Sequence, residues 1–531
     1  MWNRILSYLK KNRVVIFILA LIFVLKLPYC FDPAWYPDEG IYASIAHGLN
    51  HGQLLYADIW DNKTPMIYYF YALLFKTFGT SMFIIRFASL LFAMGAGYYF
   101  FKIFRELFPK KKVLIPAIIF ALLIATWLIE GNIANAENFF ILLTLSGLYY
   151  FVKFIKFKNP VLLIFSGFLY GLGFTFKIHP AFEFAATGLF LIMLLFFHED
   201  IKKFTFKKKV LTLFSYGISF IIPITFFVIL FFIQGNLSDF INIFHSQATG
   251  YINTDGGKNI LLNLLLSLLP RSILLIVITL GILSYIILSK KKHKIFTAPY
   301  PTLLFLIFTF ALFAVLLSGK TYVHYLIEIS GISIFILTYL FYQIFTNSDS
   351  LKKSRRYFIG CFSTFIILLI AFSYYQDKVF IPKPSNGKDD LYYLKLNFSY
   401  YPNFYKLVTG EINKANYYAK FDGKQLELAE IVDATKNLRG KQVFLADDIP
   451  WFYAIADVND PLKYTTVSHF YIDNANITDL DEQLSKYAEY IVVANYRKEY
   501  VPQEMWDYIH KNFVKVSSTQ NYDILKSIFI L

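Results

Sequence analysis

The chain has 531 residues, of which 57% are hydrophobic and only 16% are charged, against about a quarter in an ordinary soluble domain. This composition excludes a disordered chain and a fibrous repeat, and two cysteines are too few for a disulfide scaffold. A net charge of +15 suggests nucleic-acid binding in a polar chain. In a chain this apolar, it indicates basic loops along one side of a membrane instead.

Long apolar runs separated by short charged segments predict a polytopic α-helical membrane protein. A surface helix of a soluble protein would show a polar stripe at every turn, and these runs do not. The eleven expected spans are Val14–Tyr29, Met82–Phe101, Val113–Ile129, Phe139–Phe154, Val161–Phe176, Pro180–Phe197, Val210–Ile233, Ile260–Leu288, Thr302–Leu317, Tyr325–Phe345 and Tyr357–Tyr375.

Basic residues gather in alternate loops between these spans. The N-terminal segment and the loops on its side hold 25 lysines and arginines, whereas the opposite loops hold five. Because basic loops stay in the cytoplasm, we expect a cytoplasmic N-terminus in the cell membrane and an extracytoplasmic segment after Tyr375. Ten further spans follow the first, so we do not expect the first to be cleaved as a signal peptide.

The C-terminal part of the chain has a different composition, with 18 basic and 21 acidic residues after Tyr375. Its short apolar runs predict strands at Lys441–Ile449, Tyr490–Tyr496 and Tyr522–Ile530, and its amphipathic segments predict helices at Ala429–Leu438 and Gln503–Phe513. We therefore predict a membrane domain over residues 1–375 and a soluble extracytoplasmic α/β domain over residues 376–531.

Ionisable residues gather in the loops assigned to the extracytoplasmic side. Such groups are costly at membrane depth unless they line a cavity or find a partner. Five loops contribute them: Asp38, Glu39, Asp58, Asp61 and Lys63 in the first, and Glu130, Glu137, Lys177, His179, His245, Lys320 and His324 in the others. This arrangement predicts an active site on that face, with its richest loop at residues 31–80.

The first outer loop carries the acidic pair Asp38–Glu39 directly after Pro37. The pair can open a helix over Ile41–Leu49, where the helix dipole favours carboxylates, and this is the ordinary structural explanation. Two aromatic residues precede the pair, however, and an amphipathic stretch at Met66–Phe78 follows it. A carboxylate pair at a lipid interface suits chemistry on a substrate with a lipid tail.

At these residues the chain resembles the GT-C glycosyltransferases that use polyprenyl-phosphate sugars. It is most similar to the bacterial relatives of dolichyl-phosphate-mannose–protein mannosyltransferases, which include the aminoarabinose transferase of lipid A. The resemblance is strong over the first hundred residues, moderate over the rest of the membrane part and weak in the C-terminal part. The matching features are the segment Pro37–Ala93 with Lys63, Pro65, Phe78–Gly79 and Arg86, then Gly167, Gly171, Gly173, His324–Tyr325 and Tyr400–Phe421.

Three positions depart from the pattern of that family. Thr64 stands where members often have the first of two prolines, and Ile41 stands where the aminoarabinose branch has an arginine. Asn62 stands where that branch has a glutamate that helps to hold a metal. We therefore predict no metal site there, expect no required cofactor, leave a divalent metal open and leave the sugar unidentified.

The resemblance implies transfer of a sugar from polyprenyl phosphate to a hydroxyl of a glycan, lipid or protein on the extracytoplasmic face. A leaving phosphate needs no strong acid, so the reaction needs one base and nearby positive charge. Asp38 is the predicted base and Glu39 orients it or the acceptor, with inversion at the anomeric carbon. The candidate phosphate partners are Lys63, Arg86, Lys177, Lys320, His324 and Tyr325, and the candidate sugar or acceptor contacts are Tyr42, Asn135 and Glu137.

Several of these candidates also have a structural explanation, and for His324 it is an interface histidine hydrogen-bonded to the backbone. Arg86 could extend to the interface or pair with a carboxylate, and Lys177 could offset the dipole of a helix C-terminus. Asn135 and Glu137 could cap a helix that begins near Phe139. Three functional alternatives also stay open: a transferase that uses a lipid-linked oligosaccharide, a polysaccharide transporter, and a sensor or assembly factor. No nucleic-acid partner is expected.

Overall fold

The computed structural model describes residues 2–109, 111–197, 203–244, 299–317, 322–346, 392–421, 424–467, 469, 477–495 and 503–529. The expected spans Ile260–Leu288 and Tyr357–Tyr375, together with His245 and Lys320, lie outside these residues. The chain divides into two compact units. Unit 1 comprises Met1–Leu27, Ser89–Thr225 and Asp255–Pro402, and unit 2 comprises Pro28–Ala88, Phe226–Thr254 and Asn403–Leu531.

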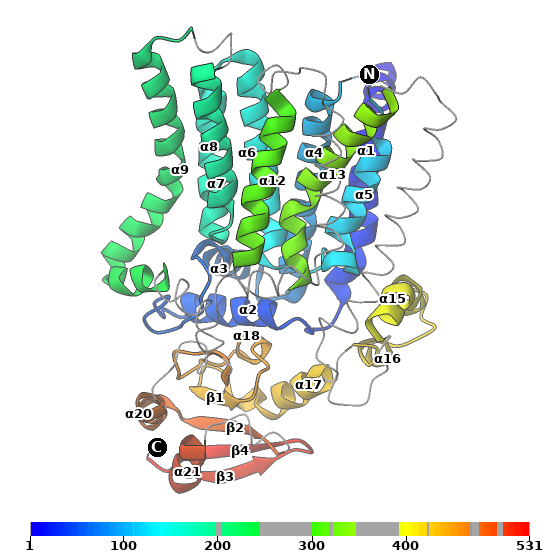
Figure 1. Ribbon diagram of the computed structural model, residues 1–531. Coiled ribbons are helices and arrows are strands. Elements are labelled where there is room, and N and C mark those ends of the chain that lie inside the picture. The colour runs from blue at the N-terminus through cyan, green and yellow to red at the C-terminus, as the bar shows by residue number, and fades with distance from the viewer. Residues whose placement is uncertain are drawn as a thin grey trace. The chain divides into compact units, whose positions relative to one another are not determined.

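Unit 1 is built from apolar helices, and α6, α7, α8, α12 and α13 run side by side (Figure 1). Aromatic rings stack within its mainly aliphatic core: the Phe100 ring stacks on Phe120 and on Phe335, with ring centroids 4.3 and 4.6 Å apart. Helices α4, α9 and α15 have residues in both units. The helices are α1 (Trp2–Lys26), α4 (Met82–Leu107), α5 (Leu114–Ala125), η2 (Trp127–Ile129), α6 (Ala136–Phe157), α7 (Pro160–Phe176), α8 (Pro180–Phe197), α9 (Phe206–Gln234), α12 (Pro299–Leu317), η3 (Val323–Tyr325), α13 (Leu326–Thr346) and α15 (Tyr392–Val408).

Two of the glycines in the family pattern let helix α7 pack closely against α9. A Cβ atom at Gly167 would lie 2.6 Å from the carbonyl oxygen of Tyr216, and one at Gly171 would overlap the carbonyl oxygen of Phe220. Small residues at helix interfaces allow this close approach in membrane proteins. Any larger side chain at either position would therefore push α7 and α9 apart.

Five helical segments within the described residues are long and apolar enough to cross a membrane: Asn12–Phe31, Met82–Leu107, Ala136–Phe157, Phe206–Gln234 and Val323–Tyr342. Shorter apolar helices accompany them. Every expected span that falls within the described residues coincides with a helix. The helical nature of these spans is therefore confirmed, whereas their number, eleven, stays a prediction.

Unit 2 contains a four-stranded mixed sheet in the order β1-β2-β4-β3, where β1 and β2 are parallel and the other pairs are antiparallel (Figure 1). The three predicted strands are confirmed, but β3 was not predicted because most of its residues are exposed and it has no continuous apolar run. The elements are α2 (Pro37–Asn50), α3 (Met66–Phe78), α16 (Lys414–Tyr418), α17 (Lys424–Ala434), η4 (Lys436–Leu438), β1 (Val443–Ala446), α18 (Trp451–Ala456), α20 (Ile477–Tyr487), β2 (Tyr490–Ala494), α21 (Gln503–Asn512), β3 (Phe513–Ser518) and β4 (Tyr522–Ser527), with η1 (Leu27–Phe31) before them.

Helix α2 is the element of unit 2 that carries the acidic pair, and its residues from Glu39 to Gly48 are buried. It packs against α3 and α18. The Ser44 hydroxyl donates a hydrogen bond to the Pro450 carbonyl, and a Cβ atom at Gly40 would lie 2.8 Å from Trp451. The predicted helix after Pro37 is thus confirmed, and close packing holds it in place.

Candidate functional site

The acidic pair lies in the first turn of α2, after Pro37. Successive residues of a helix point about 100° apart, so the two carboxylates face different surroundings. Glu39 is fully buried, whereas Asp38 is half-buried. Of the two carboxylates, only that of Asp38 is therefore in reach of a substrate from solvent or lipid.

Arg86, in helix α4, holds Glu39. Its Nη2 and Nε atoms donate to Glu39 Oε2 at 2.9 and 3.1 Å. Its remaining donors bind the carbonyl oxygens of Asp32 and Pro33 at 2.5 and 2.8 Å, and the guanidinium lies 4.4 Å from the centroid of the Tyr29 ring. Arg86 is itself fully buried. Arg86 thus pairs with a carboxylate, which is the structural explanation predicted for it from the sequence. This pairing fixes Glu39 and the loop before α2.

Lys63 lies in a turn that is held by tyrosines. The Tyr56 hydroxyl donates to the Lys63 carbonyl at 2.7 Å, and the Lys63 backbone N–H donates to the Tyr68 hydroxyl at 3.1 Å. The Lys63 Nζ atom donates to Asn62 Oδ1 at 2.8 Å, so Asn62 orients the lysine. The Lys63 residue is half-buried.

Asp61 stabilises the same turn. Its carboxylate is buried and accepts hydrogen bonds from the Tyr68 hydroxyl at 2.6 Å and the Asn62 backbone N–H at 2.7 Å. Burial raises the pKa of Asp61, but the charges of Lys63 and His469 and these hydrogen bonds outweigh it and lower the pKa below its usual value. The carboxylate is therefore ionised at neutral pH and helps to hold Lys63 in place.

Replacement of Tyr68 by phenylalanine should destabilise the protein by about 1–3 kcal/mol, because a buried Asp61 oxygen loses its hydroxyl donor. Thermal unfolding of the purified protein measures this change. The matched control is Tyr69→Phe, since the Tyr69 hydroxyl is only partly buried and makes a 3.3 Å contact with Gln234. Equal effects of the two substitutions would contradict a special role for Tyr68.

Tyr42, predicted as a sugar or acceptor contact, is buried on helix α2. Its ring packs edge-on against those of Tyr68 and Tyr71, with centroids 5.8 and 5.7 Å apart. The ring therefore also has a packing role between α2 and α3. In unit 2, Asp38, Glu39, Tyr42, Lys63 and Arg86 lie on α2, the loop before α3 and the start of α4.

A second group of ionisable residues lies within unit 1, around Lys177. Lys177 caps the C-terminus of α7, and its Nζ atom contacts the Glu137 carboxylate and lies 3.9 Å from Glu328 Oε1. The same Nζ atom lies 3.9 Å from the centroid of the Tyr325 ring. All four side chains are buried. The lysine therefore holds two carboxylates and an aromatic ring from three different elements.

Two histidines extend this group. His179 Nδ1 lies 2.6 Å from Glu328 Oε1. His324 Nδ1 lies 2.7 Å from Glu130 Oε2, and its Nε2 lies 3.9 Å from Glu137 Oε1. Acidic and basic groups thus alternate through the buried group, which is the arrangement that makes buried charges tolerable.

The loop between η2 and α6 supports this group through backbone contacts. The Asn135 side chain caps α6 by accepting a hydrogen bond from the Ala136 N–H. Helix capping is the structural explanation predicted for Asn135 from the sequence. The buried Lys26 donates to the carbonyl oxygens of Gly131 and Ile133 at 2.6 and 3.3 Å. Sequence reasoning did not select Lys26, because a lysine at the end of an apolar span is normally taken to extend to the interface.

Glu328 was also missed by sequence reasoning. It lies inside an apolar run near the start of α13, and no neighbouring motif marks it. The signal that could have found it is its charge, since a lone carboxylate at membrane depth requires a partner. The structure supplies Lys177 and His179 as those partners.

Comparisons with known proteins agree with this architecture. Residues 62–229 match the family model described as dolichyl-phosphate-mannose-protein mannosyltransferase. The structure is similar to the crystal structure of ArnT from Cupriavidus metallidurans bound to undecaprenyl phosphate, with a TM-score of 0.57 and 11% identity over 97% of this chain and 98% of that chain. The apo state of the same ArnT gives a TM-score of 0.56 with the same identity and coverage. None of the curated protein sequences matches the chain.

The fold defines the class of protein: this chain is a multi-pass helical membrane protein with an ArnT-like fold and a small C-terminal mixed sheet. The family-model match points to a glycosyltransferase. The match to the family model described as dolichyl-phosphate-mannose-protein mannosyltransferase covers residues 62–229 of the 531. The resemblance found in the sequence is therefore confirmed. The matched region contains Lys63, Arg86, Glu137 and Lys177 and begins after the acidic pair.

Proposed function

We propose that this enzyme transfers a sugar from a polyprenyl-phosphate donor to a hydroxyl group of a glycan, lipid or protein. The observation that carries the proposal is the acidic pair on a tightly packed helix, in which Glu39 is locked by Arg86 and Asp38 stays half-buried. The description of the matching family and the undecaprenyl phosphate bound to the similar ArnT support the class of donor.

In the proposed reaction, the acceptor oxygen attacks the anomeric carbon of the sugar. A new carbon–oxygen bond forms as the bond to the phosphate oxygen breaks, and the phosphate leaves as a polyprenyl monophosphate. Asp38 takes the proton of the acceptor hydroxyl. One displacement of this kind inverts the configuration at the anomeric carbon.

Glu39 and Arg86 act in this proposal as positioning residues for Asp38. Both are fully buried, and the guanidinium already binds Glu39 and two carbonyl groups. These contacts favour positioning over the direct phosphate contact that the sequence suggested for Arg86. The half-buried Lys63 then becomes the first candidate for the donor phosphate, to which it presents a point charge.

For Lys177 and His324 we propose a role in binding the donor phosphate, with Glu137 as the group that holds both. Tyr325, against whose ring Lys177 lies, would orient the lysine. Asn135 caps α6, in whose first turn Glu137 lies. Lys320 stays a proposal from the sequence, as do the extracytoplasmic placement of the site and the domain boundary at residue 375.

Replacement of Lys63 by alanine should raise the donor KM at least about tenfold and leave the acceptor KM nearly unchanged, because a charge-assisted contact to phosphate is lost. Steady-state kinetics of the purified enzyme with each substrate varied in turn measure both constants. Lys76→Ala, near the C-terminus of α3, provides the control. An unchanged donor KM in Lys63→Ala would remove Lys63 from the phosphate site.

The acceptor can be identified by mass spectrometry of surface glycans, lipids and glycoproteins in a strain that lacks the gene. We expect the loss of one sugar modification, restored by the wild-type chain and not by Asp38→Asn. A strain that keeps every modification but accumulates an unexported polysaccharide would favour a transporter instead.

A further inference from the structure

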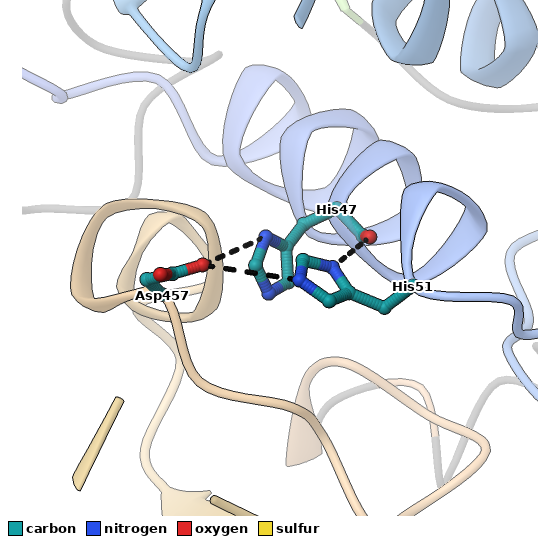
Figure 2. A group of neighbouring side chains, drawn as sticks. All are labelled: His47, His51 and Asp457. Carbon is teal, nitrogen blue, oxygen red and sulfur yellow. Dashed lines mark hydrogen bonds and ion pairs between the residues drawn. The ribbon is translucent and has the colours of Figure 1, made fainter. Parts of the chain in front are cut away.

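A cluster of three metal-ligating side chains lies in unit 2, away from the acidic pair. His47 lies in the last turn of α2, and His51 is the C-cap residue directly after the helix. Their rings lie side by side, with centroids 4.1 Å apart. Asp457 follows α18 and faces them from the other side (Figure 2). The Asp457 Oδ1 atom lies 4.0 Å from His47 Nδ1 and 4.0 Å from His51 Nε2.

The hydrogen bonding of His51 determines which of its two ring nitrogens is unprotonated and presents a lone pair to Asp457. His51 Nδ1 lies 2.9 Å from the His47 carbonyl oxygen, as Figure 2 shows. A carbonyl only accepts, so this nitrogen carries the proton, and in the neutral ring Nε2 is unprotonated. Metal-binding histidines show this same arrangement, in which the second ring nitrogen donates to a carbonyl or a carboxylate.

His47 is also positioned to act as a metal ligand. It is 5% exposed, and its ring packs against that of His51. At 4.0 Å, Asp457 is too far away for a hydrogen bond to either ring.

We propose that His47, His51 and Asp457 bind a divalent metal ion, with Zn²⁺ as the best fit. Two imidazoles, one carboxylate and a water molecule form a common zinc coordination set. The three ligand atoms all lie within 4.8 Å of one another, and zinc ligands at about 2.0–2.2 Å from the ion require only a modest approach. His51 and Asp457 are 43% and 55% exposed, so their side chains can make that movement.

The bound ion would join α2, which carries the acidic pair at its N-terminus, to the segment that follows α18. These elements already touch through Ser44 and Pro450 and through the close approach of Gly40 to Trp451. The proposed site therefore stabilises the contact between α2, the helix that carries the acidic pair, and the segment after α18. It is separate from the position Asn62, and it does not rest on the proposed sugar transfer.

Isothermal titration with ZnCl₂ tests the site in the full-length protein, purified without a polyhistidine tag and stripped with a chelator. We expect one equivalent of zinc in the wild type and an affinity at least about tenfold lower in His51→Ala and in Asp457→Asn. The exposed His510 stacks on Trp506 and belongs to no cluster of this kind among the residues that the structure describes, so His510→Ala should bind zinc like the wild type.

Thermal unfolding provides the second measurement. Zinc should raise the melting temperature of the wild type and of His510→Ala and should leave that of His51→Ala unchanged. His51 is largely exposed, so its loss should not prevent folding. Absence of zinc binding to the wild type, or equal binding by His51→Ala and the wild type, would overturn the proposal.

Discussion

Replacement of Asp38 by asparagine is expected to lower the rate of sugar transfer by about 10²–10⁴-fold, the usual contribution of a general base. The amide keeps the size of the side chain but cannot take the proton of the acceptor hydroxyl. Because Asp38 is half-buried at the start of α2, the protein should remain folded. Transfer from a polyprenyl-phosphate sugar by the purified variant measures the loss in kcat.

The matched control for this substitution is Asp433→Asn, because Asp433 is 81% exposed and pairs with a surface lysine. It should keep full activity. A variant Asp38→Asn with wild-type kcat and a normal melting temperature would show that another group is the base. If Asp38→Asn loses both activity and folding, the variant Asp38→Glu decides between the two causes, because its carboxylate should restore part of the rate.

Replacement of Arg86 by alanine is expected to destabilise the protein by about 3–5 kcal/mol, because it leaves the buried Glu39 carboxylate without its partner. The carbonyl groups of Asp32 and Pro33 lose their donors in the same substitution. Chemical or thermal unfolding in detergent measures the change. Transfer activity should fall as well, because Glu39 no longer has a fixed place beside Asp38.

The double variant Arg86→Met with Glu39→Gln distinguishes pairing from packing. Removal of both charges should recover part of the stability that Arg86→Met alone loses, as expected for a buried ion pair. Lys436→Ala, which breaks an exposed pair, should change stability by less than about 1 kcal/mol. Additive losses in the double variant would contradict the assigned role of Arg86.

Apolar runs and turn residues predicted most of the fold. The described spans all fall on helices because a run without a polar stripe has no other way to satisfy its backbone groups in lipid. Strand β3 escaped prediction because an exposed edge strand needs no apolar pattern, and its residues FVKVSS are mostly exposed. Its pairing with β4 is a tertiary property that a local pattern does not carry.

The sequence predicted many of the residues that belong to the candidate site but not which of them pair with each other. The sequence identified Glu39, Arg86, Glu137 and Lys177, yet it could not show that they form two ion pairs across 47 and 40 residues. Charge alone does not say which partner a buried group finds. Lys26 was missed because a lysine near the end of an apolar span is normally taken to extend to the interface, and only the fold brings it to the carbonyl groups of the loop before α6.

The most direct test of the proposed function uses the purified enzyme in lipid nanodiscs with two kinds of donor, a polyprenyl-phosphate sugar and the corresponding nucleotide sugar. The account predicts that only the lipid-linked donor reacts, with one polyprenyl monophosphate released for each acceptor glycosylated and with none released by Asp38→Asn. Turnover of the nucleotide sugar, or sugar transfer without release of polyprenyl monophosphate, would contradict it.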